Sequence, residues 1–274
     1  MRRDGQGLHF DPVTPEVSPL AVIGVRACDL AALRLQEAHF LRTGSADPGF
    51  QARHDALFIV AVDCAHPADT CFCASTGDGP SAGGGYDIAM AELDEGYLLR
   101  VGSAGGQGIV NALGLAPASD EQCHRAVDEQ KQAALAQTRS LPSRNLRDSL
   151  FACQDHAHWA EVAQRCLACG NCTAVCPSCF CSANEAHPSL DGVVSEQVRV
   201  WDSCFSFDHS NLHGRALRED IRLRYRQWLT HKLAGWHDQY GRSGCTGCGR
   251  CISWCPVGID LTRELPVLLE GEPG

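Results

Sequence analysis

Two kinds of apolar pattern, continuous runs and helical spacing, follow one another in the first part of the chain. Residues 20–25 and 56–62 are short apolar runs, and residues 30–41 between them show the spacing of an amphipathic helix. This order predicts a βαβ unit whose two buried strands are parallel and adjacent. Asp29 stands where the N-cap of the helix is expected.

A hairpin and a glycine-rich segment are predicted next. Residues 86–93 and 97–101 alternate apolar and polar side chains on either side of Asp94-Glu-Gly96, which predicts two antiparallel strands. Residues 102–108 contain several glycines but do not match the GxGxxG pattern of dinucleotide-binding loops. We therefore expect a plain turn there and no nucleotide site.

The second part of the chain is patterned mainly as helices. A capping-box pattern predicts a polar helix over residues 119–139, and another helix is expected over residues 147–167. Apolar residues then recur at helical spacing across residues 215–236. We place a domain boundary after the first of these helices, which gives a small α/β domain over residues 1–143 and a helical domain over residues 144–274.

Composition and charge narrow the class of protein. The formal charge of −10 argues against nucleic acid as the main partner, because nucleic-acid-binding proteins present a broad positive surface. Arg2 and Arg3 are not followed by the apolar segment of a twin-arginine signal, and no apolar run approaches the roughly twenty residues of a membrane span. With 17 cysteines and no secretory signal, the chain is expected in the cytoplasm, with cysteines as metal ligands.

Two cysteine runs with the same spacing carry the strongest chemical signal. The first run is Cys166-Leu-Ala-Cys169-Gly-Asn-Cys172-Thr-Ala-Val-Cys176-Pro177, and the second run is Cys245-Thr-Gly-Cys248-Gly-Arg-Cys251-Ile-Ser-Trp-Cys255-Pro256. Three closely spaced thiolates can bind different irons of one 4Fe-4S cubane, while the fourth reaches the other cubane. This spacing predicts two clusters with crossed ligands, the first held by Cys166, Cys169, Cys172 and Cys255, and the second by Cys245, Cys248, Cys251 and Cys176.

Zinc sites and disulfides are the alternatives for these runs. Zinc sites normally combine two CxxC pairs or include histidine, so a run of four cysteines favours iron-sulfur clusters. The segment between the runs is too long for a compact ferredoxin hairpin, and its helical periodicity resembles the α-helical ferredoxin arrangement. We therefore expect an α+β protein whose C-terminal domain is an α-helical ferredoxin domain with two 4Fe-4S clusters.

Four further cysteines converge on one predicted edge of the sheet. Cys28 follows the first predicted strand and Cys64 follows the second, while Cys71 and Cys73 lie in the next short loop. Ligands bind beyond the carboxyl ends of the strands in open α/β sheets. We therefore predict a third 4Fe-4S cluster held by Cys28, Cys64, Cys71 and Cys73, with buried core thiols as the alternative.

Five cysteines remain outside these three sets. Cys179, Cys181 and Cys204 are expected beside a cluster, where they would tune it through weak contacts, although one of them could replace a ligand. Cys123 and Cys153 lie in predicted helices without a partner at motif spacing, so we interpret both as structural.

Arginines mark one further feature of the long segment between the runs. Arg215, Arg218, Arg222 and Arg226 recur on one face of the helix predicted there. A solvated helix face is the ordinary interpretation of such a series. A docking surface for a partner is the alternative, because these cations are concentrated near the clusters of an acidic protein.

Several short motifs in combination resemble one family. They are GVRACDL at residues 24–30, Cys71-Phe-Cys73 with Gly79-Pro80, CPSCFC at residues 176–181, WDSCF at residues 201–205, and the second run. Together they resemble the iron-sulfur β subunit of cytoplasmic sulfhydrogenases and related bidirectional nickel-iron hydrogenases, which is similar to the corresponding subunit of anaerobic sulfite reductase. Members of that family usually carry further sequence ahead of GVRACDL, so we expect the first domain to be truncated at its start.

The resemblance implies an electron-transfer role and a set of partners. Such subunits pass electrons between a flavin subunit that binds NAD(P)H and a catalytic subunit, either a nickel-iron hydrogenase or a sirohaem sulfite reductase. The sequence shows no flavin site or nickel ligand set, so we expect no catalytic residues in this chain. A free-standing iron-sulfur enzyme and a metal-stabilised binding module are the alternatives.

Overall fold

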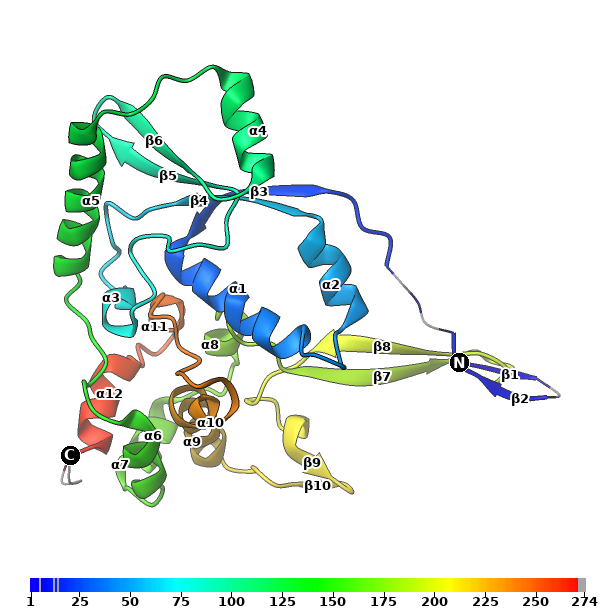
Figure 1. Cartoon of the computed structure of the whole chain (residues 1–274). Helices are drawn as coiled ribbons and strands as arrows, with labels where there is room; N and C mark the ends of the chain where they lie inside the picture. The colour runs from blue at the N-terminus through cyan, green and yellow to red at the C-terminus, as the bar shows by residue number, and fades with distance from the viewer. Residues whose placement is uncertain (5, 12, 14, 271–274) are drawn as a thin grey trace.

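The computed structural model describes residues 1–4, 6–11, 13 and 15–270 of the chain (Figure 1). Its N-terminal half is built on a mixed sheet with the strand order β3-β4-β5-β6. The strands are β3 (Leu20–Arg26), β4 (Leu57–Val62), β5 (Ile88–Leu93) and β6 (Gly96–Val101). The pairs β3–β4 and β4–β5 are parallel, and the pair β5–β6 is antiparallel. The predicted βαβ unit and hairpin are therefore confirmed.

Strand β3 lies at the edge of this sheet and is not the buried strand that its apolar sequence predicts. Within the described residues it pairs with β4 on one side only, and Leu20 and Ile23 are 57% and 73% exposed. In the adjoining strand β4, Ile59 and Ala61 are buried. An apolar run does not distinguish a central strand from an edge strand, which explains the difference.

Helices pack around the sheet, with α4 above it and α1 below it in the view of Figure 1. The helices of this half are α1 (Ala27–Phe40), α2 (Pro48–Asp55), α3 (Cys73–Thr76), α4 (Ala104–Leu113) and α5 (Asp120–Leu135). The capping box of α5 forms as predicted, with the side chains of Ser119 and Gln122 bonded to each other's backbone. Helix α1 begins earlier than predicted, because Arg26 is its N-cap residue and Asp29 lies in the first turn.

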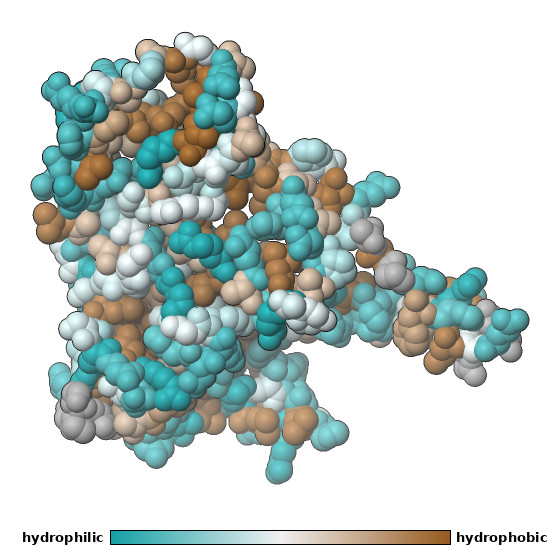
Figure 2. Space-filling view, viewed as in Figure 1, coloured by the Kyte–Doolittle hydropathy of each residue, from teal (hydrophilic) through white to brown (hydrophobic). Residues whose placement is uncertain are grey.

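Helix α4 begins at Ala104, within residues 102–108, where the sequence predicts a plain turn. Ser103 caps this helix by accepting a hydrogen bond from the N–H of Gly106. A Cβ on Gly106 would lie 2.0 Å from the carbonyl oxygen of Asp87, so the glycine lets the helix approach the sheet. The helix therefore depends on tertiary packing that local propensity does not reveal. Exposed apolar side chains gather around it (Figure 2), including Ile109, Leu113 and Leu115.

The C-terminal half is mainly helical and contains the larger core. Its helices are α6 (Leu146–Ala152), α7 (His158–Arg165), α8 (Asn171–Ala174), η1 (Asp208–Ser210), α9 (Ile221–Thr230), the π-helix η2 (His231–Gly235), α10 (Trp236–Tyr240), α11 (Arg250–Ser253) and α12 (Leu261–Leu268). The helix predicted over residues 147–167 is divided into α6 and α7 by a turn. The core between these helices includes Trp159, Tyr225, Trp228, Leu229, Leu233 and Leu265. No helix in the described part of the chain has the length and apolar character of a membrane span.

Strands also occur between the two cysteine runs, where the sequence predicts helices. Strands β7 (Ser182–Pro188) and β8 (Ser195–Trp201) form an antiparallel hairpin, and β9 (Asn211–Leu212) pairs with β10 (Arg215–Ala216). The first of these hairpins projects from the body toward a small terminal hairpin of β1 (Arg2–Asp4) and β2 (Gly7–His9), as Figure 1 shows. Most side chains of β7 and β8 are exposed, so no burial alternation marks them in the sequence.

The arginine face predicted on a helix over residues 215–236 does not form as one surface. Arg215 lies in β10 and Arg218 lies in the turn that follows, because α9 begins later in the chain. Arg226 Nη1 donates to the carbonyl oxygen of Gln154 at 2.7 Å. The four arginines therefore do not share one helix face.

Candidate iron-sulfur sites

The two cysteine runs fold into matching loops. In the first run Ala168 and Gly170 have φ angles of 51° and 76°, and at the equivalent positions of the second run Gly247 and Gly249 have φ angles of 65° and 70°. Each pair of left-handed residues curls the chain around its cysteines ahead of a short helix, α8 or α11, and these two helices pack together. The duplicated sequence is thus matched by a duplicated backbone.

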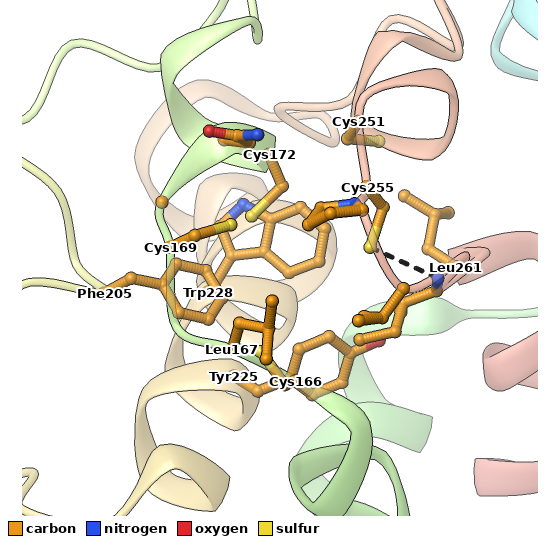
Figure 3. A pocket seen from close by; sticks show the side chains of 15 residues that line it. Cys166, Leu167, Cys169, Cys172, Phe205, Tyr225, Trp228, Cys251, Cys255 and Leu261 are labelled. Atoms are coloured by element: carbon orange, nitrogen blue, oxygen red, sulfur yellow. Dashed lines mark hydrogen bonds between the residues drawn. The ribbon is translucent and has the colours of Figure 1, made fainter.

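Sulfurs from both runs line one cavity, shown in Figure 3. The four predicted ligands of the first cluster are among them: Cys166, Cys169, Cys172 and Cys255. Aromatic and aliphatic side chains complete the wall: Phe205, Tyr225, Trp228, Ile259 and Leu261. The backbone N–H of Ala168 donates to Cys166 Sγ at 3.4 Å, and that of Ile259 donates to Cys255 Sγ at 3.2 Å. Such hydrogen bonds and an apolar wall are the surroundings that tune iron-sulfur clusters.

The other four cysteines of the two runs gather beside the first set. Cys245, Cys248 and Cys251 lie close enough to one another and to Cys176 for their charges to interact. Because Cys176 belongs to the first run, the structure brings together the crossed set that the spacing predicts. Cys251 also borders the first cavity, so the two sets of sulfurs are neighbours.

Burial makes the thiols of Cys172, Cys245 and Cys251 reluctant to ionise without a metal. It raises the pKa of Cys245 to about 12, and the nearby sulfurs of Cys176 and Cys248 add to the increase. Burial also raises the pKa of Cys172 and Cys251 above the ordinary thiol value. Since the thiolate is the form that binds metal, loading of these sites must displace protons.

The arrangement of donors fits a multi-iron cluster. Among the described residues, no three His, Cys, Asp or Glu side chains converge closely enough to hold a single metal ion. In a cubane each thiolate binds a different iron, so the four sulfurs stand further apart than those around zinc. Soft thiolate donors gathered around one cavity suit a 4Fe-4S cluster.

The N-terminal cysteines form a third group next to the second set of sulfurs. Cys64, Cys71 and Cys73 lie within range of one another's charges. Cys28 lies within range of the charges of both Cys73 and Cys248. The structure therefore brings together the four residues predicted at the sheet edge, and it places them against the second run.

Tight backbone packing joins this N-terminal group to the second run. The N–H of Phe72 donates to the carbonyl oxygen of Gly247 at 2.9 Å. A Cβ on Gly247 would lie 2.5 Å from the Cα of Cys73, and a Cβ on Gly249 would lie 2.1 Å from the carbonyl oxygen of Thr70. Only glycine permits so close an approach at these two positions.

Two ion pairs reinforce the same junction. Arg250 donates to both carboxylate oxygens of Asp29 in α1, and Arg242 donates to both carboxylate oxygens of Asp78. The side chain of Asp78 is buried and that of Asp29 is partly exposed. Asp29 therefore connects α1 to the second run and does not act as the N-cap that the sequence predicts.

The cysteines outside the three sets occupy two kinds of position. Cys179 lies against Cys176, and Cys181 lies against Cys204. Cys204 is also near Cys172, so Cys179, Cys181 and Cys204 all lie in the region of the two runs. The two cysteines interpreted as structural lie on α5 and just after α6: Cys123, which is exposed, and Cys153, which is buried.

Lys232 is a charged residue in this region that no motif in the sequence selects as functional. Lys232 is buried in the π-helix η2, and its Nζ donates to Ser178 Oγ at 3.1 Å. The surrounding residues at helical spacing, Trp228 and Trp236, are apolar and buried. A lysine on the buried side of such a helix is the signal that could have revealed it.

Comparisons with known proteins agree with the geometry of the two runs. Residues 165–259 match the family model of the 4Fe-4S dicluster domain, and this region contains both runs. The chain is 32% identical over 256 residues to sulfhydrogenase 2 subunit beta of Pyrococcus furiosus, which corresponds to 91% of this chain and 74% of that relative. No solved structure matches the chain.

Proposed function

This chain belongs to the family of sulfhydrogenase beta subunits, and from that premise we propose how this iron-sulfur electron-transfer subunit is used. We propose that it relays electrons between a flavin subunit that binds NAD(P)H and a nickel-iron hydrogenase catalytic subunit of a cytoplasmic complex. The single observation that carries the proposal is the convergence of five cysteines from both runs on one cavity. A 4Fe-4S cluster bound there supplies one-electron transfer.

The two C-terminal clusters are assigned to crossed ligand sets. The first is held by three cysteines of the first run with Cys255, and the second by Cys245, Cys248 and Cys251 with Cys176. The closeness of the sulfurs within each set supports this assignment. Crossed ligands tie the two runs together, so neither loop can open without loss of a ligand.

A third cluster is assigned to the N-terminal group, with Cys28, Cys64, Cys71 and Cys73 as its ligands. The mutual closeness of these sulfurs supports the assignment. Gln137 Nε2 donates to Cys73 Sγ at 3.3 Å, which is the kind of hydrogen bond that supports a metal-bound sulfur. Gly79 leaves room for this sulfur, since a Cβ there would lie 2.8 Å from it.

The three sites are proposed to form a continuous path. Cys28 lies beside Cys248, and Cys251 lies beside Cys172, so each group of sulfurs adjoins the next. At the far end, Cys169 is exposed, and so is Leu167, which also lines the first cavity. We place one partner protein at this exposed end and the other near the N-terminal group.

The path crosses the proposed boundary between residues 1–143 and residues 144–274. Phe72 from the first domain packs in the core of the second, and the pair Arg250–Asp29 joins the two. This packing supports a fixed distance between the N-terminal group and the second run. A fixed distance suits electron transfer, because it requires no movement of the domains.

Anaerobic purification of the full chain with its bound proteins tests the proposal. Iron and acid-labile sulfide should each reach about twelve atoms per chain for three cubanes, or about eight if only the C-terminal clusters form. The clusters should be reduced and reoxidised reversibly in a potentiometric titration followed by EPR. A nickel-iron hydrogenase subunit should co-purify.

Three results would contradict parts of this proposal. Zinc in place of iron would refute iron-sulfur clusters in the two runs. Clusters that cannot be reduced would refute a relay and would indicate a structural role. Co-purification of a sirohaem subunit would assign the same relay to a sulfite reductase and exclude the hydrogenase.

A further inference from the structure

A buried ammonium group lies beside the second set of sulfurs. Lys232 is 5% exposed, and its Nζ donates to Ser178 Oγ at 3.1 Å. Ser178 Oγ lies 3.4 Å from Cys176 Sγ, so a single hydroxyl group connects the ammonium to a proposed ligand of the second cluster. A charge at this depth requires an anionic partner, because an unpaired buried charge is costly.

In the part of the chain that the structure describes, Lys232 forms no ion pair with an aspartate or a glutamate. The ionisable side chains beside it are those of Cys176, Cys179 and Cys245. The face of the Trp236 ring lies 4.6 Å from Nζ and supplies no net charge. The opposite charge is expected from the cysteine sulfurs beside it, which are thiolates when they hold a metal. A cubane with four thiolates carries about −2 in its oxidised form and would provide it.

The backbone around Lys232 holds the ammonium in this position. The π-helix η2 lies between α9 and α10, and an inserted π-turn shifts the direction of the side chains that follow. The carbonyl oxygen of Lys232 accepts a hydrogen bond from the N–H of Gly244 at 2.8 Å, directly before the second run. Ser178, directly after the first run, donates to the carbonyl oxygen of Gly244 at 2.6 Å. Lys232 is therefore bonded to the flanks of both runs.

We propose that Lys232 sets the reduction potential of the second cluster by holding a fixed positive charge beside Cys176 and Cys245. This inference rests on the second cluster of the proposed function. Reduction adds one electron and no proton, which changes the charge of the cluster with its thiolates from about −2 to about −3. The ammonium stabilises the more negative form, so its presence raises the potential. Among the described residues that line the first cavity there is no lysine or arginine, so that cluster lacks the same charge at its wall.

Potentiometric titration of the full-length protein, with dithionite as the electron donor and EPR as the readout, tests this role. Lys232→Met removes the charge and keeps an unbranched side chain, whereas Lys232→Arg keeps the charge. We expect Lys232→Met to lower the equilibrium constant for reduction of one cluster at least tenfold, which is about 59 mV for one electron. Lys232→Arg should stay near the wild-type potential. Lys131→Met removes the chain's other lysine, which is exposed, and should shift no cluster.

Iron content measured on the same samples separates the outcomes. If Lys232→Met kept the wild-type iron content and unchanged reduction potentials, the proposed effect of Lys232 on the potential would be overturned. Loss of about four irons in Lys232→Met but not in Lys232→Arg would support it, because the cluster would then need the charge in order to bind. The same loss in both variants would overturn it, since binding of the cluster would then depend on the shape of the side chain and not on its charge. Wild-type protein without 4Fe-4S clusters would instead refute the proposed function, before any variant is compared.

Discussion

The two cysteine runs have the same spacing but different surroundings. In the first run Cys169 is exposed and Leu167 is 63% exposed. In the second run Gly247 and Gly249 are buried against the N-terminal half of the chain. The spacing therefore determines which sulfurs come together, while the surroundings determine whether a run is exposed or buried.

One pair of equivalent positions shows how the two runs diverge. Both positions have a positive φ, yet the first run has Ala168 where the second has Gly247. The first run accommodates a methyl group in this conformation. In the second run a Cβ would collide with the backbone of Cys73. Equivalent loops can thus carry different residues wherever their neighbours differ, even though the cysteines stay fixed.

Replacing one crossing ligand from each run gives the largest expected effect. Cys255→Ala should remove the first cluster, with about four irons, and leave a cluster whose potential still responds to Lys232→Met. Cys176→Ala should remove the second cluster and the response to Lys232→Met with it. Iron analysis and EPR titration of the single and double variants measure both effects. If Cys255→Ala abolished the response to Lys232→Met, the ligands would not be crossed.

The difference in packing predicts unequal tolerance of a methyl group. Gly170 and Gly249 are equivalent and both have a positive φ, so alanine costs about 1–2 kcal/mol at either position for backbone reasons. At Gly249 the Cβ would also lie 2.1 Å from the carbonyl oxygen of Thr70, whereas at Gly170 the nearest atom, Ser203 Oγ, is 3.4 Å away. We expect Gly249→Ala to lower the free energy of unfolding by about 1–3 kcal/mol more than Gly170→Ala.

Denaturant unfolding under anaerobic conditions compares the two variants. The iron content of each sample should be measured first, because cluster loss would itself change stability. Equal losses of stability in Gly249→Ala and Gly170→Ala would show that the N-terminal loop moves aside, and the proposed tight junction would then be wrong.

Features that depend on near neighbours in the sequence could be predicted. Each run places three cysteines within one short loop, so its spacing alone predicts a cluster. The helical spacing of Trp228, Leu229 and Leu233 predicts their burial correctly, because one face of a helix must meet the core. The hairpin of β5 and β6 follows from alternation around a short turn for the same reason.

Features that depend on distant neighbours could not be predicted in the same way. The apolar sequence of β3 does not reveal that Leu20 and Ile23 lie on an edge strand. The helical spacing of Lys232 could indicate its burial, but not that Ser178 and Gly244 would lie beside it. The adjacency of Cys28 and Cys248 arises only when the two halves of the chain pack. In each case the deciding contact comes from a segment far along the chain.

A double-mutant cycle on Arg250 and Asp29 measures how much charge contributes to holding the second run. Their side chains are 37% and 23% exposed, so solvent screening limits the coupling to about 1 kcal/mol. Unfolding of Arg250→Gln, Asp29→Asn and the double variant gives this value. The first run has Asn171 at the equivalent position, and Asn171→Gln should change stability by less than about 0.5 kcal/mol. A coupling near zero would mean that packing alone holds the junction.

A weaker contact joins the N-terminal half to the segment that follows the first run. Phe180 of that segment stacks on His39 of α1 with ring centroids 4.1 Å apart, and His39 Nδ1 lies 2.7 Å from Tyr240 Oη. Burial, together with the charges of Arg42 and Arg199, lowers the pKa of His39 below its ordinary value of 6.5. The fold therefore favours the neutral ring at this contact.

The smallest expected effect is the pH dependence that His39 contributes. Because its pKa is lower in the folded protein, the unfolded chain binds the proton first as the pH falls. The stabilising contribution should be complete above pH 6.5 and should decline below it, until His39 is protonated in both states. His39→Phe keeps a stacking ring without a charge, so it should show a smaller loss of stability between pH 7.5 and 5.5 than the wild type. An unchanged loss in His39→Phe would assign the pH dependence to other groups and leave this contact insensitive to pH.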